Sequence, residues 1–188
     1  MMLRTRIPGH AALAASALLL ACGGTPQRAT SMADLSASAS ASSSPDAMAY
    51  GADVVRDLER VRAATDEFHD IAAAHAAGYP TRVPGCLENP PAGGMGLHYV
   101  HPDRLDDHLD VEHPEILVYA PTSSGKPKLV GVEYVVPFSA RGPDEEAPRI
   151  FGRSLKRAPR LRLWYLHVWV WERNSNGLFA DWNPAVKC

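Results

Sequence analysis

Three ionisable side chains of this 188-residue chain lie inside stretches that are otherwise apolar: His98, Glu133 and His167. Burying such a group is costly unless it finds a partner. Two imidazoles and one carboxylate form a ligand set that suits zinc, iron or copper, and three protein ligands leave a coordination position open for water or a substrate. A metal held in this way can polarise a carbonyl group or lower the pKa of a bound water molecule. These residues therefore predict a metal site.

Two other interpretations are open for the same residues. One is a pocket without a metal that binds or transforms a small molecule. The other is a purely structural arrangement. In that case Glu133 and one histidine form a buried hydrogen-bonded pair, and the second histidine bonds to the backbone or to a tyrosine hydroxyl.

The alternation of side chains along a β-strand decides whether the three groups can meet. The expected neighbours on one face are Leu129, Gly131 and Val135 for Glu133, and Tyr165 and Trp169 for His167. Gly131 leaves space beside Glu133 because it has no side chain. If the strands pair so that these faces coincide, two imidazoles and one carboxylate converge in a pocket with aromatic walls.

A second concentration of polar side chains runs from His101 to His113. The order of acidic residues that forms a calcium-binding loop is absent from it, so we expect a solvated acidic loop. If this loop folds over the pocket, His101 or Asp107 could add a further ligand or control access to the metal.

Hydrophobic periodicity predicts the elements that must position these residues. Short runs of branched and aromatic residues indicate strands at residues 97–100, 116–120, 129–136 and 161–171, with a hairpin turn at residues 121–128. The run from residue 163 to residue 171 is apolar on both faces except for His167. We therefore expect it to be the central strand, covered on both sides.

Ahead of the strands, apolar residues recur at spacings of three and four between residues 52 and 77, which predicts one amphipathic helix. Asp53 suits the start of this helix and Gly78 suits its end. The expected fold class is α+β, with one long N-terminal helix packed on an antiparallel β-sheet in a single domain.

The first residues have the layout of a secretory signal. Arg4 and Arg6 precede an apolar run over residues 11–21, which is too short to span a membrane, and Cys22 follows it. Residues 19–22 resemble the lipobox of bacterial lipoproteins. The resemblance implies that Cys22 becomes the new N-terminus and carries acyl chains such as palmitate, which would hold the mature protein on a membrane. The alternative is an ordinary signal peptide that has a cysteine at this position by chance.

Three segments are expected on this basis: a lipoprotein signal peptide at residues 1–21, a disordered tether at residues 22–50 and a globular α+β domain at residues 51–188. The tether is rich in Ser and Ala and has too few large apolar side chains to form a core. The expected location is the cell envelope, facing out of the cytoplasm. Gly23, rather than Asp, after the lipidated cysteine favours the outer over the inner membrane if the cell is Gram-negative, as the lipoprotein resemblance implies.

Once Cys22 is assigned to lipid, the two cysteines that remain are Cys86 and Cys188. In an oxidising compartment they are expected to form a disulfide. Free or metal-binding thiols are the alternative, although the chain contains no C-x-x-C pair. The formal net charge of −2 gives no indication of a nucleic-acid partner.

Several segments together resemble a family of bacterial exported proteins and lipoproteins to which no activity is assigned. The segments share the patterns Gly-Met-Gly-x-His-Tyr, Pro-Glu-x-Leu-Val-Tyr, Val-Glu-Tyr, His-x-Trp-x-Trp and Trp-Asn-Pro with a final cysteine. In this chain they are residues 94–99, 114–119, 132–134, 167–171 and 182–184, and Cys188. The resemblance implies a common fold and assigns no catalytic residue.

The leading hypothesis is a membrane-anchored lipoprotein that binds a metal or another ligand through a His/Glu pocket. Whether it is an enzyme stays open, because a nucleophile elbow, an H-E-x-x-H helix and a phosphate-binding loop are all absent from the sequence. The alternative is a non-catalytic envelope lipoprotein that binds a small molecule or a protein partner through an aromatic-walled pocket. A third is a scaffold domain whose buried polar residues only specify the fold.

Overall fold

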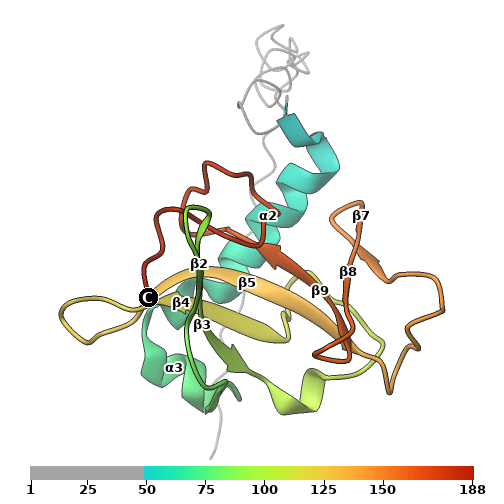
Figure 1. Cartoon of the computed structure of the whole chain (residues 1–188), viewed down its shortest axis with the longest axis horizontal. Helices are drawn as coiled ribbons and strands as arrows, with labels where there is room; N and C mark the ends of the chain where they lie inside the picture. Colours follow the sequence, from blue (N-terminus) through green and yellow to red (C-terminus); the bar gives the residue numbers. More distant parts are fainter. Residues whose placement is uncertain (1–48) are drawn as a thin grey trace, which may run out of the picture. The chain divides into compact units, whose positions relative to one another are not determined.

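The computed structural model describes residues 49–188 (Figure 1). The predicted signal peptide, the lipidation at Cys22 and most of the predicted tether lie outside these residues. Within them, no helix has both the length and the apolar character needed to cross a membrane.

An antiparallel sheet of seven strands forms the centre of the fold, in the order β1-β3-β4-β5-β9-β8, with β2 also paired to β3 (Figure 1). The strands are β1 Thr81–Arg82, β2 Leu87–Asn89, β3 Gly93–Val100, β4 Ile116–Ala120, β5 Lys128–Pro137, β8 Lys156–Ala158 and β9 Leu163–Val168. A separate hairpin pairs β6 Arg149–Ile150 with β7 Arg153–Ser154. The predicted α+β class, with a multi-stranded antiparallel sheet, is confirmed.

The single helix predicted over residues 52–77 is wrong. Helix α2 covers Ala52–Thr65, a 3-10 turn η1 covers Asp66–His69, and a short helix α3 covers Ile71–Ala76. The break occurs at Asp70, whose backbone is extended and whose carboxylate accepts a hydrogen bond of 3.0 Å from the N–H of Ala72. Aspartate favours this capping role over a place inside a helix, so it starts a new helix instead of continuing the old one.

The two faces of the sheet belong to different clusters of buried side chains. One cluster joins alternate strand residues such as Leu117 and Tyr119 to Leu58 and Val61 of α2. The other lies on the opposite face and includes Ile116, Val118, Val135, Trp169 and Val186. This second cluster shares its face with the candidate site described below.

A β-bulge in β5 changes which residues share a face. The pairing with β4 shifts register between Val118 and Tyr119, which face Gly131 and Leu129 and leave Val130 as the extra residue. Leu129 therefore joins the cluster on the helix side, while Val130 joins the opposite one. The prediction that Leu129 shares a face with Glu133 is wrong for this reason.

Strand β5, and not β9, is the long central strand. Figure 1 shows β5 curving between β4 and β9, and β9 in turn lies beside the short edge strand β8. Strand β9 also ends at Val168, before the predicted limit at residue 171. The regular ladder ends there because the N–H of Trp169 bonds to Leu178 instead of to β5, although the N–H of Trp171 returns to Val130 of β5.

The C-terminal segment is fixed to β3 at two glycines. Cys86 and Cys188 lie at disulfide distance, with 1.97 Å between the sulfur atoms, as predicted. Asn183 exchanges backbone hydrogen bonds of 3.1 and 3.0 Å with Gly94. Gly93 has a φ of 110°, and a Cβ added to it would lie 2.1 Å from the carbonyl oxygen of Asn183. No side chain fits between these two backbones.

Replacing Gly93 with alanine is expected to lower the free energy of unfolding by about 2 kcal/mol or more, because the new Cβ adds a backbone clash to the cost of a positive φ. Urea denaturation followed by tryptophan fluorescence measures this. Gly85→Ala is the matched control, since Gly85 has a similar φ of 92° and open space around it. Equal losses in the two variants would show that the close approach to Asn183 contributes nothing.

Candidate metal centre

Three different strands supply the candidate ligands, called the triad from here on: His98 from β3, Glu133 from β5 and His167 from β9. Glu133 and His167 are direct cross-strand partners in the register of β5 and β9. His98 is aligned with Val118 and, through it, with Gly131, so it approaches the other two diagonally.

The side-chain atoms of the triad meet at one point. The Nε2 atoms of His98 and His167 are 3.1 Å apart. The Nε2 atom of His167 lies 3.2 Å from one oxygen of Glu133, and that of His98 lies 3.5 Å from the other oxygen. One ligand atom from each residue falls within 4.8 Å of the others, so this group could hold a metal ion.

The two histidines come together from strands that are not neighbours. Strands β3 and β9 are separated by β4 and β5, and three steps of about 4.8 Å put them about 14 Å apart in a flat sheet. The two imidazoles therefore lean toward each other over β4 and β5. Gly131 of β5 lets the backbone of β9 come close, since a Cβ there would lie 2.7 Å from the carbonyl oxygen of Val168.

Burial and neighbouring charges shift the pKa values of His98 and Glu133. The exposed fractions of the side chains are 13% for His98, 9% for Glu133 and 1% for His167. Burial lowers the pKa of His98, as does the neighbouring His167, although Glu133 opposes both. Burial tends to raise the pKa of Glu133, but His167 and His98 outweigh it and the net shift is downward. A neutral imidazole beside an ionised carboxylate is the state that binds a metal.

Neighbouring groups hold the imidazoles in place. The backbone of Gly96 lies close enough to His98 to raise its pKa, against the larger effect of burial. The rings of Tyr165 and Trp169 lie 6.4 and 5.5 Å from that of His167, so the two predicted aromatic neighbours are beside it.

The geometry of the triad fits a metal of ordinary size. Bonds of about 2.1 Å place neighbouring ligand atoms about 3.0 Å apart on an octahedron and about 3.4 Å apart on a tetrahedron. The two Nε2 atoms, 3.1 Å apart, match these values, as does the 3.2 Å between Nε2 of His167 and its nearer Glu133 oxygen. His98 lies 3.5 Å from the other oxygen of Glu133, and one ligand atom from each residue falls within 4.8 Å of the others. A metal bound through a single oxygen of Glu133 would therefore require the side chains to adjust.

The structure does not bring the two further candidates to the triad. The ring of His101 packs against Tyr79 at 5.1 Å, and its Nδ1 atom is buried without a hydrogen-bond partner. Both carboxylate oxygens of Asp107 accept hydrogen bonds from Arg141, at 2.7 and 3.0 Å. Neither residue is among the converging ligands, so a role as lid or fourth ligand has no support from their positions.

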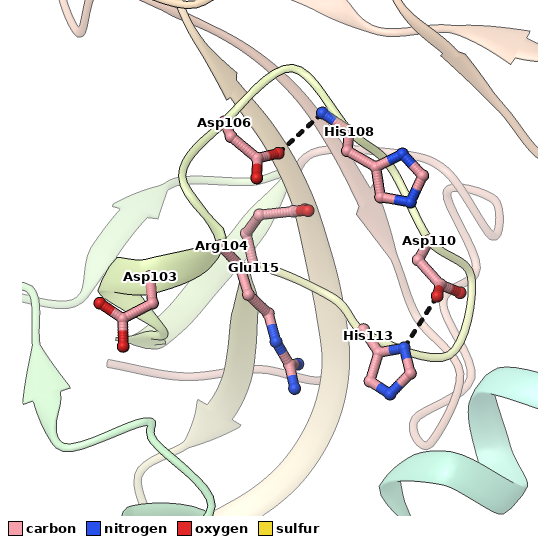
Figure 2. A pocket seen from close by; sticks show the side chains of 7 residues that line it. All are labelled: Asp103, Arg104, Asp106, His108, Asp110, His113 and Glu115. Carbon is pink, nitrogen blue, oxygen red and sulfur yellow. Dashed lines mark hydrogen bonds and ion pairs between the residues drawn. The ribbon is translucent and has the colours of Figure 1, made fainter.

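The acidic loop instead lines a small open cavity of its own, of about 230 Å³. Figure 2 shows the side chain of Glu115 extending into the ring of the loop, on the same side as Asp106 and His108. The acidic and imidazole groups of this loop do not converge: in residues 49–188 the triad is the one group of three or more that could hold a metal.

Glu115 is a residue that the sequence analysis missed. Its side chain is almost completely buried, and one carboxyl oxygen accepts a hydrogen bond of 2.9 Å from the N–H of Val135. Burial raises the pKa of Glu115 to about 8, although this hydrogen bond opposes the rise. The local sequence gives no signal for this burial, because Glu115 follows Pro114 at the end of the polar loop.

Two tryptophans and a tyrosine line a larger cavity, of about 610 Å³, between the start of α2 and the segment after β9. Trp169 belongs to its wall, but no member of the triad does. The triad and the aromatic cavity are therefore neighbours rather than a single pocket, in contrast to the expected aromatic-walled pocket.

Comparisons with protein-family models, with curated proteins and with solved structures found no match. The function of this chain is therefore inferred from the geometry of the site alone.

Proposed function

We propose that this protein is an exported, lipid-anchored protein of the cell envelope whose triad of His98, Glu133 and His167 binds a divalent transition metal. The observation that carries the metal part is the convergence of three ligand atoms from three strands, within 4.8 Å of one another. The anchoring part is supported by the apolar run before Cys22 and by the lipobox resemblance of residues 19–22.

Zinc is the first metal to test, ahead of iron and copper. Zinc is commonly bound by four ligands, whereas an octahedral iron site would need three further ligands beside the triad. The three side chains are 13%, 9% and 1% exposed, which leaves little room for three additional groups. Three protein ligands with one open position is also the arrangement of catalytic rather than structural zinc sites, so the bound metal would hold a water molecule or a small substrate.

The second candidate function is binding of a small molecule without a metal. The aromatic cavity favours it, because Tyr50, Trp169 and Trp171 share its wall with polar groups such as Arg62 and Asn174. Such walls combine apolar contact with orienting hydrogen bonds. In this case the triad would be a hydrogen-bonded network, since its separations are also hydrogen-bond lengths.

Elemental analysis of the purified full chain tests the proposal. We expect close to one metal per chain, and loss of that metal in the variant His98→Ala/His167→Ala. Intact-mass measurement of the same preparation tests the anchor, since cleavage before Cys22 and acylation change the mass in known steps. A chain that is free of metal after purification and does not take up added zinc, iron or copper would refute the metal site.

A further inference from the structure

The turn between β8 and β9 holds an apolar side chain in solvent between two arginines. Leu161 is 70% exposed and is flanked by Arg160 and Arg162. Hydrogen bonds from the N–H of Leu161 to Ala158 and from that of Arg162 to Pro159, at 3.1 and 3.3 Å, fix the turn. The φ of Arg162 is 56°, a conformation that disfavours a side chain. The fold thus keeps Leu161 outward at some cost.

The surrounding surface is basic. Between residues 149 and 162 the chain has six basic residues and no acidic one. Two of them are neutralised from outside, since Lys156 pairs with Asp181 and Arg157 lies 3.8 Å from Asp144. The other four have no carboxylate within ion-pair distance among the described residues: Arg149, Arg153, Arg160 and Arg162. Arg149 and Arg153 belong to the β6–β7 hairpin before the edge strand β8, and Arg160 and Arg162 flank Leu161 in the turn after it. These four arginines and Leu161 are called the basic face below.

The hairpin end of the basic face lies near Tyr50, one of the first residues that the structure describes. The ring of Tyr50 packs edge-on against Phe179, with 5.8 Å between centroids. The guanidinium group of Arg153 lies over the same Phe179 ring, 4.8 Å from its centroid. Tyr50 and Arg153 therefore contact the same aromatic ring beside the β6–β7 hairpin.

We propose that the basic face docks on anionic phospholipid headgroups of the membrane that carries the chain. This inference rests on the lipid-anchored part of the proposed function. A guanidinium group can donate two parallel hydrogen bonds to the oxygens of one phosphate. An apolar side chain that lies between two arginines can enter the boundary between headgroups and acyl chains. The whole chain has a net charge of −2, so the attraction comes from this face and not from overall charge.

The test uses the full chain, isolated from the membrane fraction, with vesicles of phosphatidylcholine alone or with about 30% phosphatidylglycerol. Hydrogen exchange followed by mass spectrometry is expected to show protection of residues 149–162 on the anionic vesicles only, and its loss in high salt. Each arginine near an anionic surface contributes about fivefold to binding. Arg160→Glu/Arg162→Glu should therefore weaken binding of the unlipidated chain by at least about 25-fold, and Leu161→Ser should weaken it further.

Lys126→Glu/Lys187→Glu is the matched control. It makes the same change in charge at two exposed residues. One lies in the yellow β4–β5 turn and the other beside the C-terminus, and Figure 1 shows both segments on the opposite side from β7 and β8. We expect it to bind like the wild type.

Three results would overturn the docking proposal. The first is that both pairs of substitutions weaken binding to anionic vesicles equally. The second is that phosphatidylcholine vesicles or inorganic phosphate protect residues 149–162 from exchange as well as anionic vesicles do. The third is that the chain binds an oligonucleotide more tightly than the vesicles. Mass measurement keeps this test separate from that of the anchor. A lipidated chain without protection at residues 149–162 refutes the docking alone, whereas an unlipidated chain refutes the anchor.

Discussion

Adding zinc to the metal-free protein is expected to raise the free energy of unfolding by about 4 kcal/mol when free zinc exceeds its dissociation constant a thousandfold. The reason is that His98, Glu133 and His167 meet in the folded state, whereas 69 residues separate the two histidines along the unfolded chain. A metal therefore binds the folded state far better than the unfolded one. Urea denaturation at constant pH, with zinc or with a chelator, measures the difference.

The double variant His98→Ala/His167→Ala is expected to be insensitive to zinc, because Glu133 alone cannot hold it. His108→Ala is the control: it removes an exposed imidazole from the acidic loop and should leave the zinc effect intact. Equal stabilisation of the double variant and the wild type would place the metal elsewhere. If neither zinc nor the chelator changes the free energy of unfolding of the wild type, the triad is a hydrogen-bonded network.

The members of the triad could be identified because each of them is an isolated ionisable residue in an apolar strand, while their convergence was conditional on the pairing of the strands. Alternation placed His167 beside Tyr165 and Trp169, and the structure agrees. The pairing of the strands could not be predicted in the same way. The pairing depends on the register between neighbouring strands, and isolated ionisable residues do not determine that register.

The bulge at Val130 shows a second limit of the sequence. The residues around it, from Leu129 to Val132, are apolar or glycine without alternation, so nothing in their types marks Val130 as extra. The break between α2 and α3 is different, because Asp70 is a good helix start and could have been recognised as one. The apolar periodicity continues on both sides of Asp70, and it favoured the prediction of one continuous helix over a new helix start.

The burial of Glu115 arises from a long-range arrangement. Next to Pro114 and at the end of a polar loop, Glu115 looks like a solvated residue. It becomes buried because the loop returns across it and because Val135 of β5 offers it a backbone N–H. Neither contact can be inferred from the local sequence, and together they produce the second large effect that we predict.

The variant Glu115→Gln is expected to be more stable than the wild type above pH 8, and the difference should vanish near pH 4. The pKa of Glu115 is raised from 4.5 to about 8 in the folded state. Between these values the folded protein binds more protons than the unfolded chain, so the free energy of unfolding of the wild type falls as the pH rises. At about 1.4 kcal/mol per pKa unit, the loss by pH 8 is on the order of 4 kcal/mol.

Glutamine removes this loss because it stays neutral while its amide oxygen can still accept the hydrogen bond from Val135. Urea denaturation of both proteins from pH 4 to pH 9 gives the difference directly, and the other titrating groups cancel in it. Glu59→Gln, at an exposed position of α2, controls for the change in net charge. Parallel curves for wild type and Glu115→Gln over this range would mean that Glu115 is ionised in the folded state, and that the acidic loop does not exclude water from its carboxyl group.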